Sequence, residues 1–421
     1  MNATLTREPG HQAPVTSLFE EFEVASAFQP IISPTHNRVV GVEALARPSH
    51  KGLPVSPAEI FNRTDGKPHN GDLDLKLWQQ HLHNFARQLP PAWLFLNVSA
   101  DSIGAPGISP RILADQVRQA GLGCDQVVLE IVEQAVASEQ LLQDFVEDAR
   151  RLGFRVAVDD FGAGDANFER VWRLQPFIVK MDRAMVVHAA ANESARKLFI
   201  SLVRLIRENG SLVLVEGVET RQQAEIAMQS EADLYQGFYF ARPSQVLNQD
   251  QETLDRFRVF QEDYNQCQHL QARKHEEQLR HLRFEILAAC HSLARQEPLQ
   301  LVAEPLLRIP GVARCFLLDH RGIQQGPVAV SERGNRRFLK PDFNPLYQSQ
   351  GASWSHREYF LRAIDNPSQI NVSRPYVALP DTRSTVTISA QTFTRRGNRI
   401  LCVDLHPEIA FPGLQELPDT L

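Results

Sequence analysis

Apolar, strand-like runs that end in acidic or amide side chains are the feature that most constrains the fold of this chain. Five such runs succeed one another, and a sixth ends in a single amine. Their terminal side chains are Glu43, Asn97, Glu130, Glu133, Asp159, Asp160, Lys180, Glu216 and Glu219. A carboxylate at the end of a buried strand needs water, a partner or a metal ion. When several strands of one sheet end this way at the same edge, the charges converge, and a metal site is predicted.

The first half of the chain alternates short apolar runs with stretches of helical spacing. Eight apolar runs lie between about Phe22 and Phe240. Strands that alternate with helices indicate an α/β fold with a mostly parallel sheet, and eight of them indicate a closed, TIM-like (β/α)8 barrel. The first two runs are separated only by residues 33–38, which are too few for a helical crossover. They should form a hairpin, so one barrel strand is expected to run antiparallel.

The stretch from Ser244 to Glu297 contains neither glycine nor proline and predicts one long helix. It carries two apolar stripes with steps of three, four and seven residues. The stripes consist of Phe257, Phe260, Tyr264 and Cys267, and of Leu279, Leu282, Ile286 and Leu293. Such stripes pack against a partner helix or cover the adjacent domain of the same chain, and the sequence leaves both alternatives open.

After Pro298 the pattern changes to short β-rich runs with one helical segment, which indicates a small α+β domain. Four parts are therefore expected along the chain. They are a flexible N-terminal segment (1–20), the barrel (21–245), a long connecting helix (246–297) and the C-terminal domain (298–421).

Composition limits the class of protein. Of the 421 residues, 43% are hydrophobic and 22% are charged, with a net charge of −6, which argues against a general binder of nucleic acid polymers or anionic membranes. The five cysteines show no Cys-x-x-Cys spacing and are expected to be reduced thiols. The sequence shows no apolar signal-peptide core and no apolar run of the roughly 20 residues that span a bilayer, so a cytoplasmic location without membrane contact is expected.

The converging side chains are rich in oxygen and include no histidine. Such a set suits Mg²⁺ or Mn²⁺ better than zinc, and neighbouring acids such as Asp159 and Asp160 can each serve a different ion. Two cations can activate one water for phosphoryl displacement, with Lys180 as a cationic partner. A barrel glycosidase with two carboxylates is an alternative, but the amide of Asn97 and the amine of Lys180 fit a two-metal site better.

Several motifs occur in an order that resembles the EAL-domain cyclic-di-GMP phosphodiesterases. The motifs are QPI at Gln29–Ile31, EALAR at Glu43–Arg47, NVS at Asn97–Ser99, EIVE at Glu130–Glu133, DDFGAG at Asp159–Gly164, KMD at Lys180–Asp182, EGVE at Glu216–Glu219 and QGFYFARP at Gln236–Pro243. The similarity covers roughly the first 245 residues. The resemblance implies hydrolysis of one phosphodiester of cyclic-di-GMP to give linear pGpG.

The resemblance also implies a role for each matching residue. The direct ligands of two Mg²⁺ or Mn²⁺ ions would be Glu43, Asn97, Glu130, Asp159 and Asp160. Lys180 would orient the attacking water, and Glu216 and Gln236 would hold the metal-bound waters and the substrate side. Arg47 would contact a substrate phosphate, Gln29 a guanine or the nearby sugar, and Asp160 would also lie near the substrate. Glu133 would steady the loop that follows the DDFG motif.

That loop departs from the family pattern. Members usually continue with Tyr-Ser-Ser, whereas this chain has Asp165-Ala166-Asn167-Phe168. In the family the loop couples dimerisation to metal binding, so a homodimer is expected. The turnover rate is the property that the altered loop would affect. A catalytically weak receptor that binds cyclic-di-GMP and signals through the long helix is therefore the alternative function.

The C-terminal domain is similar to PAS/Cache-type sensor domains in the segment from Trp354 to Phe360, and again around Tyr376 and Thr387–Ser389. This similarity implies regulation of the barrel by a small anionic or zwitterionic ligand. The corresponding residues are Trp354, Arg357, Tyr359 and Tyr376. In the alternative interpretation the aromatic residues are core and Arg357 is a structural ion-pair partner, with no ligand.

Overall fold

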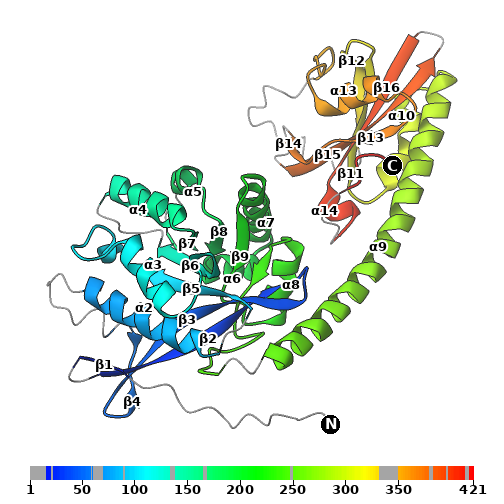
Figure 1. Ribbon diagram of the computed structural model, residues 1–421. Helices are drawn as coiled ribbons and strands as arrows, with labels where there is room; N and C mark the ends of the chain where they lie inside the picture. Colours follow the sequence, from blue (N-terminus) through cyan, green and yellow to red (C-terminus); the bar gives the residue numbers. More distant parts are fainter. Residues whose placement is uncertain are drawn as a thin grey trace, which may run out of the picture. The chain divides into compact units, whose positions relative to one another are not determined.

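The computed structural model of the protein describes residues 16–19, 22–57, 59, 70–88, 91–132, 138–164, 168–246, 250–330, 349–378, 383–394, 397–412 and 417–421. The chain divides into two compact units, Met1–Glu262 and Asp263–Leu421, and the division falls within one long helix, α9 (Asp250–Ala294) (Figure 1). The predicted long helix is confirmed. No helix in the ranges above is both long and apolar enough to cross a membrane.

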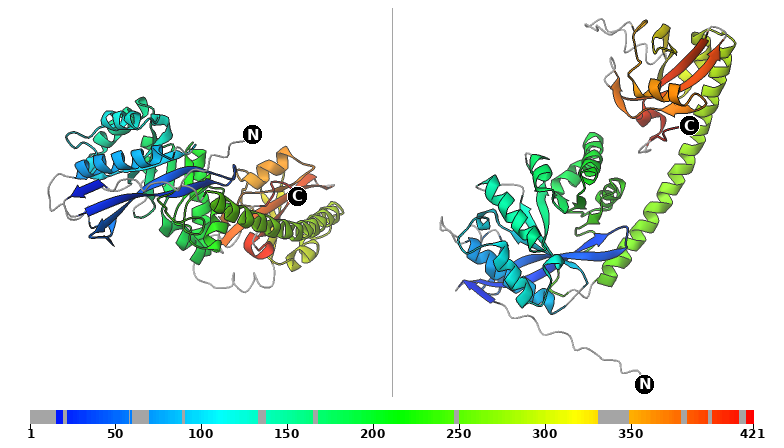
Figure 2. Two further views of the ribbon diagram at one scale, coloured as in Figure 1. Left: turned by 60° about the horizontal axis from the view of Figure 1, so that its bottom comes forward. Right: turned by 45° about the horizontal axis from the view of Figure 1, so that its top comes forward.

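The first unit contains a closed barrel. Its elements are β1 (Thr16–Phe19), β2 (Phe22–Ser33), β3 (Arg38–His50), β4 (Leu53–Pro54), α2 (Asn70–Ala86), β5 (Trp93–Val98), η1 (Ala100–Ser102), α3 (Pro110–Gln119), η2 (Cys124–Gln126), β6 (Val127–Val132), α4 (Glu139–Arg151), β7 (Arg155–Phe161), α5 (Phe168–Leu174), β8 (Ile178–Met181), α6 (Arg183–Ala191), α7 (Glu193–Glu208), β9 (Leu212–Val215), α8 (Arg221–Gln229) and β10 (Leu234–Tyr235). The strand order β2-β10-β9-β8-β7-β6-β5-β3 closes through the β2–β3 pair. Helices surround this ring in all views (Figures 1 and 2).

The barrel confirms the sequence-based prediction strand by strand. Each of the eight apolar runs forms a strand of the ring. Strand β2 is antiparallel to both neighbours, β3 and β10, while the other neighbouring pairs are parallel. The short connection after β2 therefore forms the expected hairpin.

The N-terminal segment differs from the expectation where it is described. Residues 16–19, expected in a flexible segment, form strand β1, which pairs antiparallel with the first residues of β2 (Thr16 opposite Val24). Because β2 begins well before its barrel pairing with β10, its early residues offer free backbone groups that β1 satisfies.

The second unit is built on an antiparallel sheet. Its elements are α10 (Leu299–Val302), α11 (Glu304–Arg308), β11 (Val312–Asp319), β12 (Gln324–Val330), α13 (Glu358–Asp365), β13 (Ile370–Val372), β14 (Tyr376–Ala378), β15 (Arg383–Thr394), β16 (Gly397–Leu405) and α14 (Pro407–Ala410). The order is β12-β11-β16-β15-β13, with β14 also paired to β15. This is the α+β composition that was predicted, and the helical segment is α13. The PAS/Cache likeness stays a prediction.

Helix α9 uses its apolar stripes to cover its own chain. Phe257 and Phe260 are buried in the barrel cluster that also contains Phe240. Leu282 and Ile286 are buried against the sheet of the second unit. Of the two alternatives that the sequence left open, these residues follow the second.

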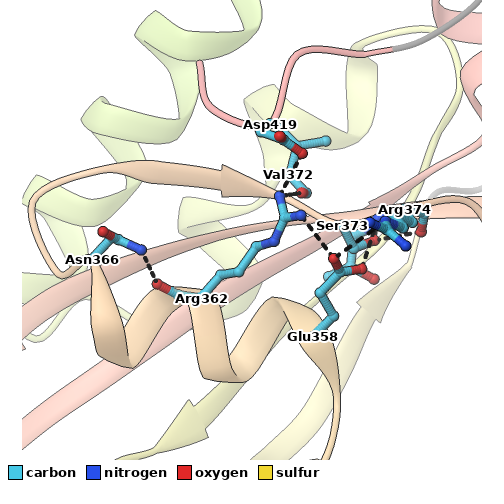
Figure 3. A network of polar contacts seen from close by, with 8 residues as sticks. Glu358, Arg362, Asn366, Val372, Ser373, Arg374 and Asp419 are labelled. Carbon is cyan, nitrogen blue, oxygen red and sulfur yellow. Dashed lines mark hydrogen bonds and ion pairs between the residues drawn. The ribbon is translucent and has the colours of Figure 1, made fainter.

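A network of ion pairs and hydrogen bonds connects α13 to the edge of the sheet (Figure 3). Arg362 of α13 pairs with Asp419 at 2.7 Å and with Glu358 at 2.8 Å, and it donates to the backbone oxygen of Val372 at 2.9 Å. Glu358 also accepts from the backbone N–H of Arg374 at 3.0 Å. The side chains thus fix α13 to β13 and to the last residues of the chain.

A buried histidine predicts how the barrel unit responds to pH. His81 of α2 is only 4% exposed, and its Nδ1 lies 2.8 Å from Ser26 Oγ of β2. Burial lowers the pKa of His81 to about 4, whereas an unfolded histidine titrates near about 6.5. The contribution of the neutral, buried His81 to the free energy of unfolding is complete above the unfolded pKa of about 6.5. It is lost progressively as the pH falls from that value to about 4. Between pH 7 and pH 5 the free energy of unfolding should fall by about 2 kcal/mol from this residue.

Urea unfolding followed by tryptophan fluorescence at both pH values checks this prediction. His81→Gln should remove that part of the pH dependence. His83→Gln, on the exposed side of the same helix, is the control and should keep it. Equal pH dependence of the wild type and His81→Gln would contradict the assignment.

Candidate metal and phosphate site

The barrel interior consists of an apolar layer with a polar layer above it. The apolar layer is formed by Ile31, Phe95, Val128, Ala157, Ile178, Leu214 and Leu234, all buried. On the parallel strands, the residue two positions later points to the same side, because side chains alternate along a strand. These residues are Asn97, Glu130, Asp159, Lys180, Glu216 and Gln236. The strand period alone therefore places six predicted site residues in one layer at the C-terminal end of the barrel.

Lys180 lies at the centre of this layer. Its Nζ is 2.6 Å from Glu130 Oε1, 2.6 Å from Glu216 Oε1, 3.0 Å from Asp159 Oδ1 and 4.0 Å from Glu43 Oε2. The Lys180 side chain is 1% exposed and that of Glu130 is fully buried. Burial works against the charged amine, but the four carboxylates outweigh it and raise the pKa of Lys180 well above its ordinary value. The amine is therefore a fixed positive charge.

The carboxylates carry more negative charge than Lys180 balances. Burial raises the pKa of both Glu130 and Glu216 well above the usual range, and Lys180 offsets only part of this effect. The pKa of Asp160 is raised by burial and by its neighbour Asp159. Such a site favours a further positive charge.

Two sets of carboxylates have the geometry to hold cations. Glu43, Glu130 and Glu216 offer oxygens that lie within 4.8 Å of one another, and so do Asp159, Asp160 and Glu216. Oε2 of Glu130 is buried and has no hydrogen-bond partner among the described residues. Oxygen donors, excess negative charge and an unpartnered buried oxygen fit hard divalent cations. Glu216 belongs to both sets, although the resemblance assigned it to water rather than to direct coordination.

Three amide side chains adjoin the carboxylates, from the antiparallel strand β2, from β5 and from the residue after β10. Gln29 of β2 lies directly opposite Glu43 of β3 in the sheet register. Gln236 Nε2 donates to Glu43 Oε2 at 2.6 Å and to Gln29 Oε1 at 3.3 Å, and Asn97 Nδ2 donates to Glu43 Oε1 at 3.3 Å. The structure thus brings Gln29, Asn97 and Gln236 together around one carboxylate.

Asp160 occupies a strained backbone position. Its φ is +55°, in the left-handed region that few side chains adopt, and the pairing of β7 with β8 shifts register between Val158 and Phe161. The backbone N–H of Asp160 donates to Asp159 Oδ1 at 2.9 Å. This irregularity turns Asp160 to the same end of the barrel as Asp159, and strain of this kind is concentrated at functional sites.

The remaining predicted residues are not joined to the cluster. Arg47 lies on β3 four residues beyond Glu43, is exposed, and donates to the backbone oxygen of Ala46 at 3.0 Å. Its pKa is lowered by partial burial, against the effect of Glu43. Glu133 and the altered loop at Asp165–Asn167 lie outside the described residues.

The structure also shows supporting residues that the sequence analysis missed. Asp74 of α2 is 4% exposed and accepts from the backbone N–H of Ser99 at 2.9 Å and from Ser102 Oγ at 2.6 Å. Trp78 of the same helix donates to the backbone oxygen of Asn97 at 2.8 Å. Helix α2 therefore fixes the strand end that presents Asn97. These contacts join residues about 20 or more positions apart, and no local motif indicates them.

The close approach of two loops predicts the effect of a substitution beside Gln236. A Cβ at Gly237 would lie 2.1 Å from the backbone oxygen of Val218, so Gly237→Ala must move one backbone segment. The variant should lose about 1–3 kcal/mol of stability and bind Mn²⁺ more weakly, because Gln236 and the loop after β9 both shift. Thermal unfolding and titration of free Mn²⁺ by electron paramagnetic resonance measure the two effects.

Gly210→Ala is the control for this experiment. Gly210 has a φ of +93°, and a Cβ at that position would meet no atom within 4 Å, so its substitution costs backbone strain without a clash. It should also lower stability but leave Mn²⁺ binding unchanged. Equal Mn²⁺ binding by the two variants would show that the clash at Gly237 does not reach the site.

Comparison with known proteins agrees with this geometry. The chain is similar to the cyclic di-GMP phosphodiesterase RocR of Pseudomonas aeruginosa, with 28% identity over 235 residues, or 53% of this chain and 57% of RocR. It is 36% identical over 118 residues to the probable cyclic di-GMP phosphodiesterase PdeA of Escherichia coli, which is 28% of this chain and 16% of PdeA. The chain thus spans little more than half of these relatives at most.

Among solved structures, the Bacillus subtilis YkuI protein, which has an EAL domain and was solved with cyclic-di-GMP and calcium, has a similar fold. The TM-score is 0.72 at 22% identity, and the match covers 91% of this chain and 96% of that chain, so it extends over both units. The model of the EAL domain family matches residues 15–243, and the chain therefore belongs to the EAL domain family.

Proposed function

We propose that the barrel hydrolyses cyclic-di-GMP to linear pGpG with the help of two Mg²⁺ or Mn²⁺ ions. The observation that carries the proposal is the buried amine of Lys180, which lies within 4.0 Å of four carboxylates at the C-terminal end of the barrel strands. The choice of substrate is supported by the name of RocR as a cyclic di-GMP phosphodiesterase, by that of PdeA as a probable one, and by the ligand of YkuI.

The proposed cation ligands are Glu43, Asn97, Glu130, Asp159 and Asp160, and Glu216 is a member of both sets of carboxylates. Bound divalent cations would supply Lewis acidity and neutralise charge on the phosphate. The protein fixes the ligand oxygens before the substrate arrives, because each of these residues stands on or directly beside a barrel strand. Such preorganisation makes electrostatic stabilisation effective.

Lys180 and Glu216 are the proposed groups for the attacking water. Lys180 Nζ is a charged donor that orients the water oxygen toward phosphorus. Glu216 Oε1 lies 2.6 Å from Lys180 Nζ, so its carboxylate is close enough to accept a proton from the same water. Water adds to phosphorus, the bond from phosphorus to the ribose 3′ oxygen breaks, and that oxygen takes up a proton. The product carries a 5′ phosphate and a free 3′ hydroxyl.

Substrate contacts are proposed for residues beside the carboxylates. Gln29 and Gln236, joined by their 3.3 Å hydrogen bond, border the side of the site next to Glu43. The exposed guanidinium of Arg47 is available for a substrate phosphate. Asp160 and the loop-stabilising Glu133 keep the roles that the family resemblance implies.

A turnover assay tests the proposed activity. Purified protein with Mg²⁺ or Mn²⁺ should convert cyclic-di-GMP to pGpG, as followed by nucleotide chromatography. Glu43→Ala should lower the rate at least about a hundredfold, because it removes a carboxylate of the charged layer. Glu23→Ala, at an exposed glutamate on the adjoining strand, is the matched control and should leave the rate unchanged. Binding without conversion by the wild-type protein would identify a receptor and exclude the enzyme.

We further propose that the second unit regulates the barrel through a small polar ligand beneath α13. The sheet face toward α13 combines an apolar cluster, which includes Phe316 and Cys402, with several polar side chains. Across four strands it carries Gln324, Leu318, Ile400 and Gln391 side by side. Asp404 and Thr387, also buried, follow on the same face. The opposite face, against α9, is apolar.

Two amides on this face, Gln324 and Gln391, each have one buried polar atom without a hydrogen-bond partner among the described residues. Gln324 is 3% exposed, and its Oε1 accepts from Trp354 Nε1 at 3.2 Å. Because tryptophan can only donate, the Nε2 of Gln324 points elsewhere, and it has no hydrogen-bond partner among the described residues. An unpartnered buried donor costs about 1–3 kcal/mol, which a ligand acceptor would recover.

Aromatic residues predicted for the ligand site surround this face. Tyr359 is buried and stacks on Tyr376 with ring centroids 6.3 Å apart. Tyr376 is hydrogen-bonded to Thr387, which donates to Asp404, both at 2.6 Å. Arg357 is exposed and lies 5.6 Å from the centre of the Tyr376 ring. Arg357 could thus meet a ligand only from the solvent side.

Native mass spectrometry and the turnover assay test this regulatory proposal. Gln324→Leu in the full chain should remove any small molecule that purifies with the wild type, and should change the rate of cyclic-di-GMP hydrolysis at least about twofold. Gln300→Leu, at an exposed position of α10, is the control. Identical mass spectra and rates for Gln324→Leu and the wild type would contradict the regulatory role. The homodimer stays a prediction.

A further inference from the structure

One acid that the sequence analysis singled out has no part in the charged layer. Glu219 ends the EGVE motif, three residues after Glu216, and its side chain is directed to α6. Glu219 Oε2 lies 2.9 Å from a terminal nitrogen of Arg183, the first residue of α6, in a pair whose side chains are 34% and 59% exposed. The pair spans the gap between the loop after β9 and the helix after β8.

The side-chain stem of Arg183 packs directly on the loop that follows Glu216. Gly217 has a φ of +60°, and a Cβ at that position would lie 2.4 Å from Arg183 Cγ and 2.5 Å from its Cβ. There is consequently no room for a side chain at Gly217. The backbone of the loop rests against the aliphatic part of Arg183.

The first turn of α6 also supports the loop after β7. Gly162 follows the DDF segment with a φ of +94°, and a Cβ there would lie 2.7 Å from Met185 Sδ. The backbone N–H of Asp182 donates to the oxygen of Phe161 at 3.1 Å. One helical turn therefore touches the two loops that follow Asp159–Asp160 and Glu216.

The far end of the loop after β9 is fixed independently. Gln223 Oε1 accepts from the backbone N–H groups of Glu219 at 2.7 Å and of Thr220 at 3.0 Å, which caps α8. The near end is held by the hydrogen bond from the N–H of Glu216 to the oxygen of Met181 at 3.2 Å. Between these ends, the backbone of Val218 is hydrogen-bonded to Gln236 at 3.1 Å and to Tyr239 at 2.9 Å, and from the side of α6 the Arg183 side chain packs on the loop.

We propose that the Arg183–Glu219 ion pair positions Glu216 and, through α6, fixes the loop after β9 relative to the loop after β7. We call this ion pair the brace. The inference rests on the proposed phosphodiesterase function for its kinetic part only. An exposed ion pair adds little to global stability. Its effect is instead on geometry, because small displacements of reacting groups cost large factors in rate. Arg183 and Glu219 are positioning residues and do not contact the substrate.

Substitutions that separate charge from bulk test the brace. Arg183→Met keeps the unbranched stem against Gly217 and removes the charge, Arg183→Lys keeps both, and Glu219→Gln removes the partner's charge. Arg221→Met and Glu225→Gln are the controls, since these residues form a similarly exposed pair at 3.0 Å within α8. All variants are made in the full chain.

For the turnover assay we expect kcat to fall about tenfold in Arg183→Met and Glu219→Gln, with KM unchanged. The double variant should be no worse than the poorer single variant, because both remove the same interaction. Arg183→Lys should recover most of the rate, and both controls should match the wild type. An additive double variant, or a loss of kcat in the controls of equal size, would overturn the brace.

Mn²⁺ titration by electron paramagnetic resonance gives a second measurement that does not depend on catalysis. Arg183→Met should bind Mn²⁺ about threefold more weakly, since the oxygen positions of Glu216 and Asp160 become less fixed. If the wild type proves inactive, the proposed function fails but this titration still decides on the brace. Unchanged Mn²⁺ affinity together with unchanged kcat in Arg183→Met would refute it.

Discussion

The burial of one lysine among carboxylates is the interaction on which the rest of this structure depends. Lys180 lies within 4.0 Å of Glu43, Glu130, Asp159 and Glu216, and each comes from a different strand or strand end. A buried charge is tolerated only when it is paired, so any strand that slipped by one residue would leave an uncompensated charge in the core. The barrel register and the electrostatics of the site therefore constrain each other.

Both the fold and the site depend on the two-residue period of side chains along a strand. The same inward face supplies an apolar side chain to the barrel floor and, two residues later, a polar one to the layer above, as in Val128 and Glu130 or Ile178 and Lys180. Lengthening the chain by one residue between them would turn the polar group outward. This coupling explains why the motif order in the sequence is so informative.

The sequence predicted what is local. The strands, the β2–β3 hairpin and the long helix follow from apolar runs, a short connection and the absence of glycine and proline, and the layer containing Lys180 follows from the strand ends. The contact of Asp74 with Ser99 and the pair of Arg183 with Glu219 join separate elements, and no spacing rule indicates them. The strained φ of Asp160 was likewise hidden, because aspartate carries no signal for a left-handed backbone as strong as that of glycine.

The second unit buries a few polar side chains on one face of an open sheet that carries apolar clusters on both faces. Its apolar face is covered by α9, and this cluster is sufficient to bury a core. The face beneath α13 includes an apolar cluster, but its polar groups add cost, since Asp404 and Thr387 must be desolvated and then satisfied by Arg314 and Tyr376. An apolar face would stabilise the unit at least as well. Asp404 is satisfied within the unit, whereas the buried Nε2 of Gln324 has no hydrogen-bond partner among the described residues, which costs about 1–3 kcal/mol of stability.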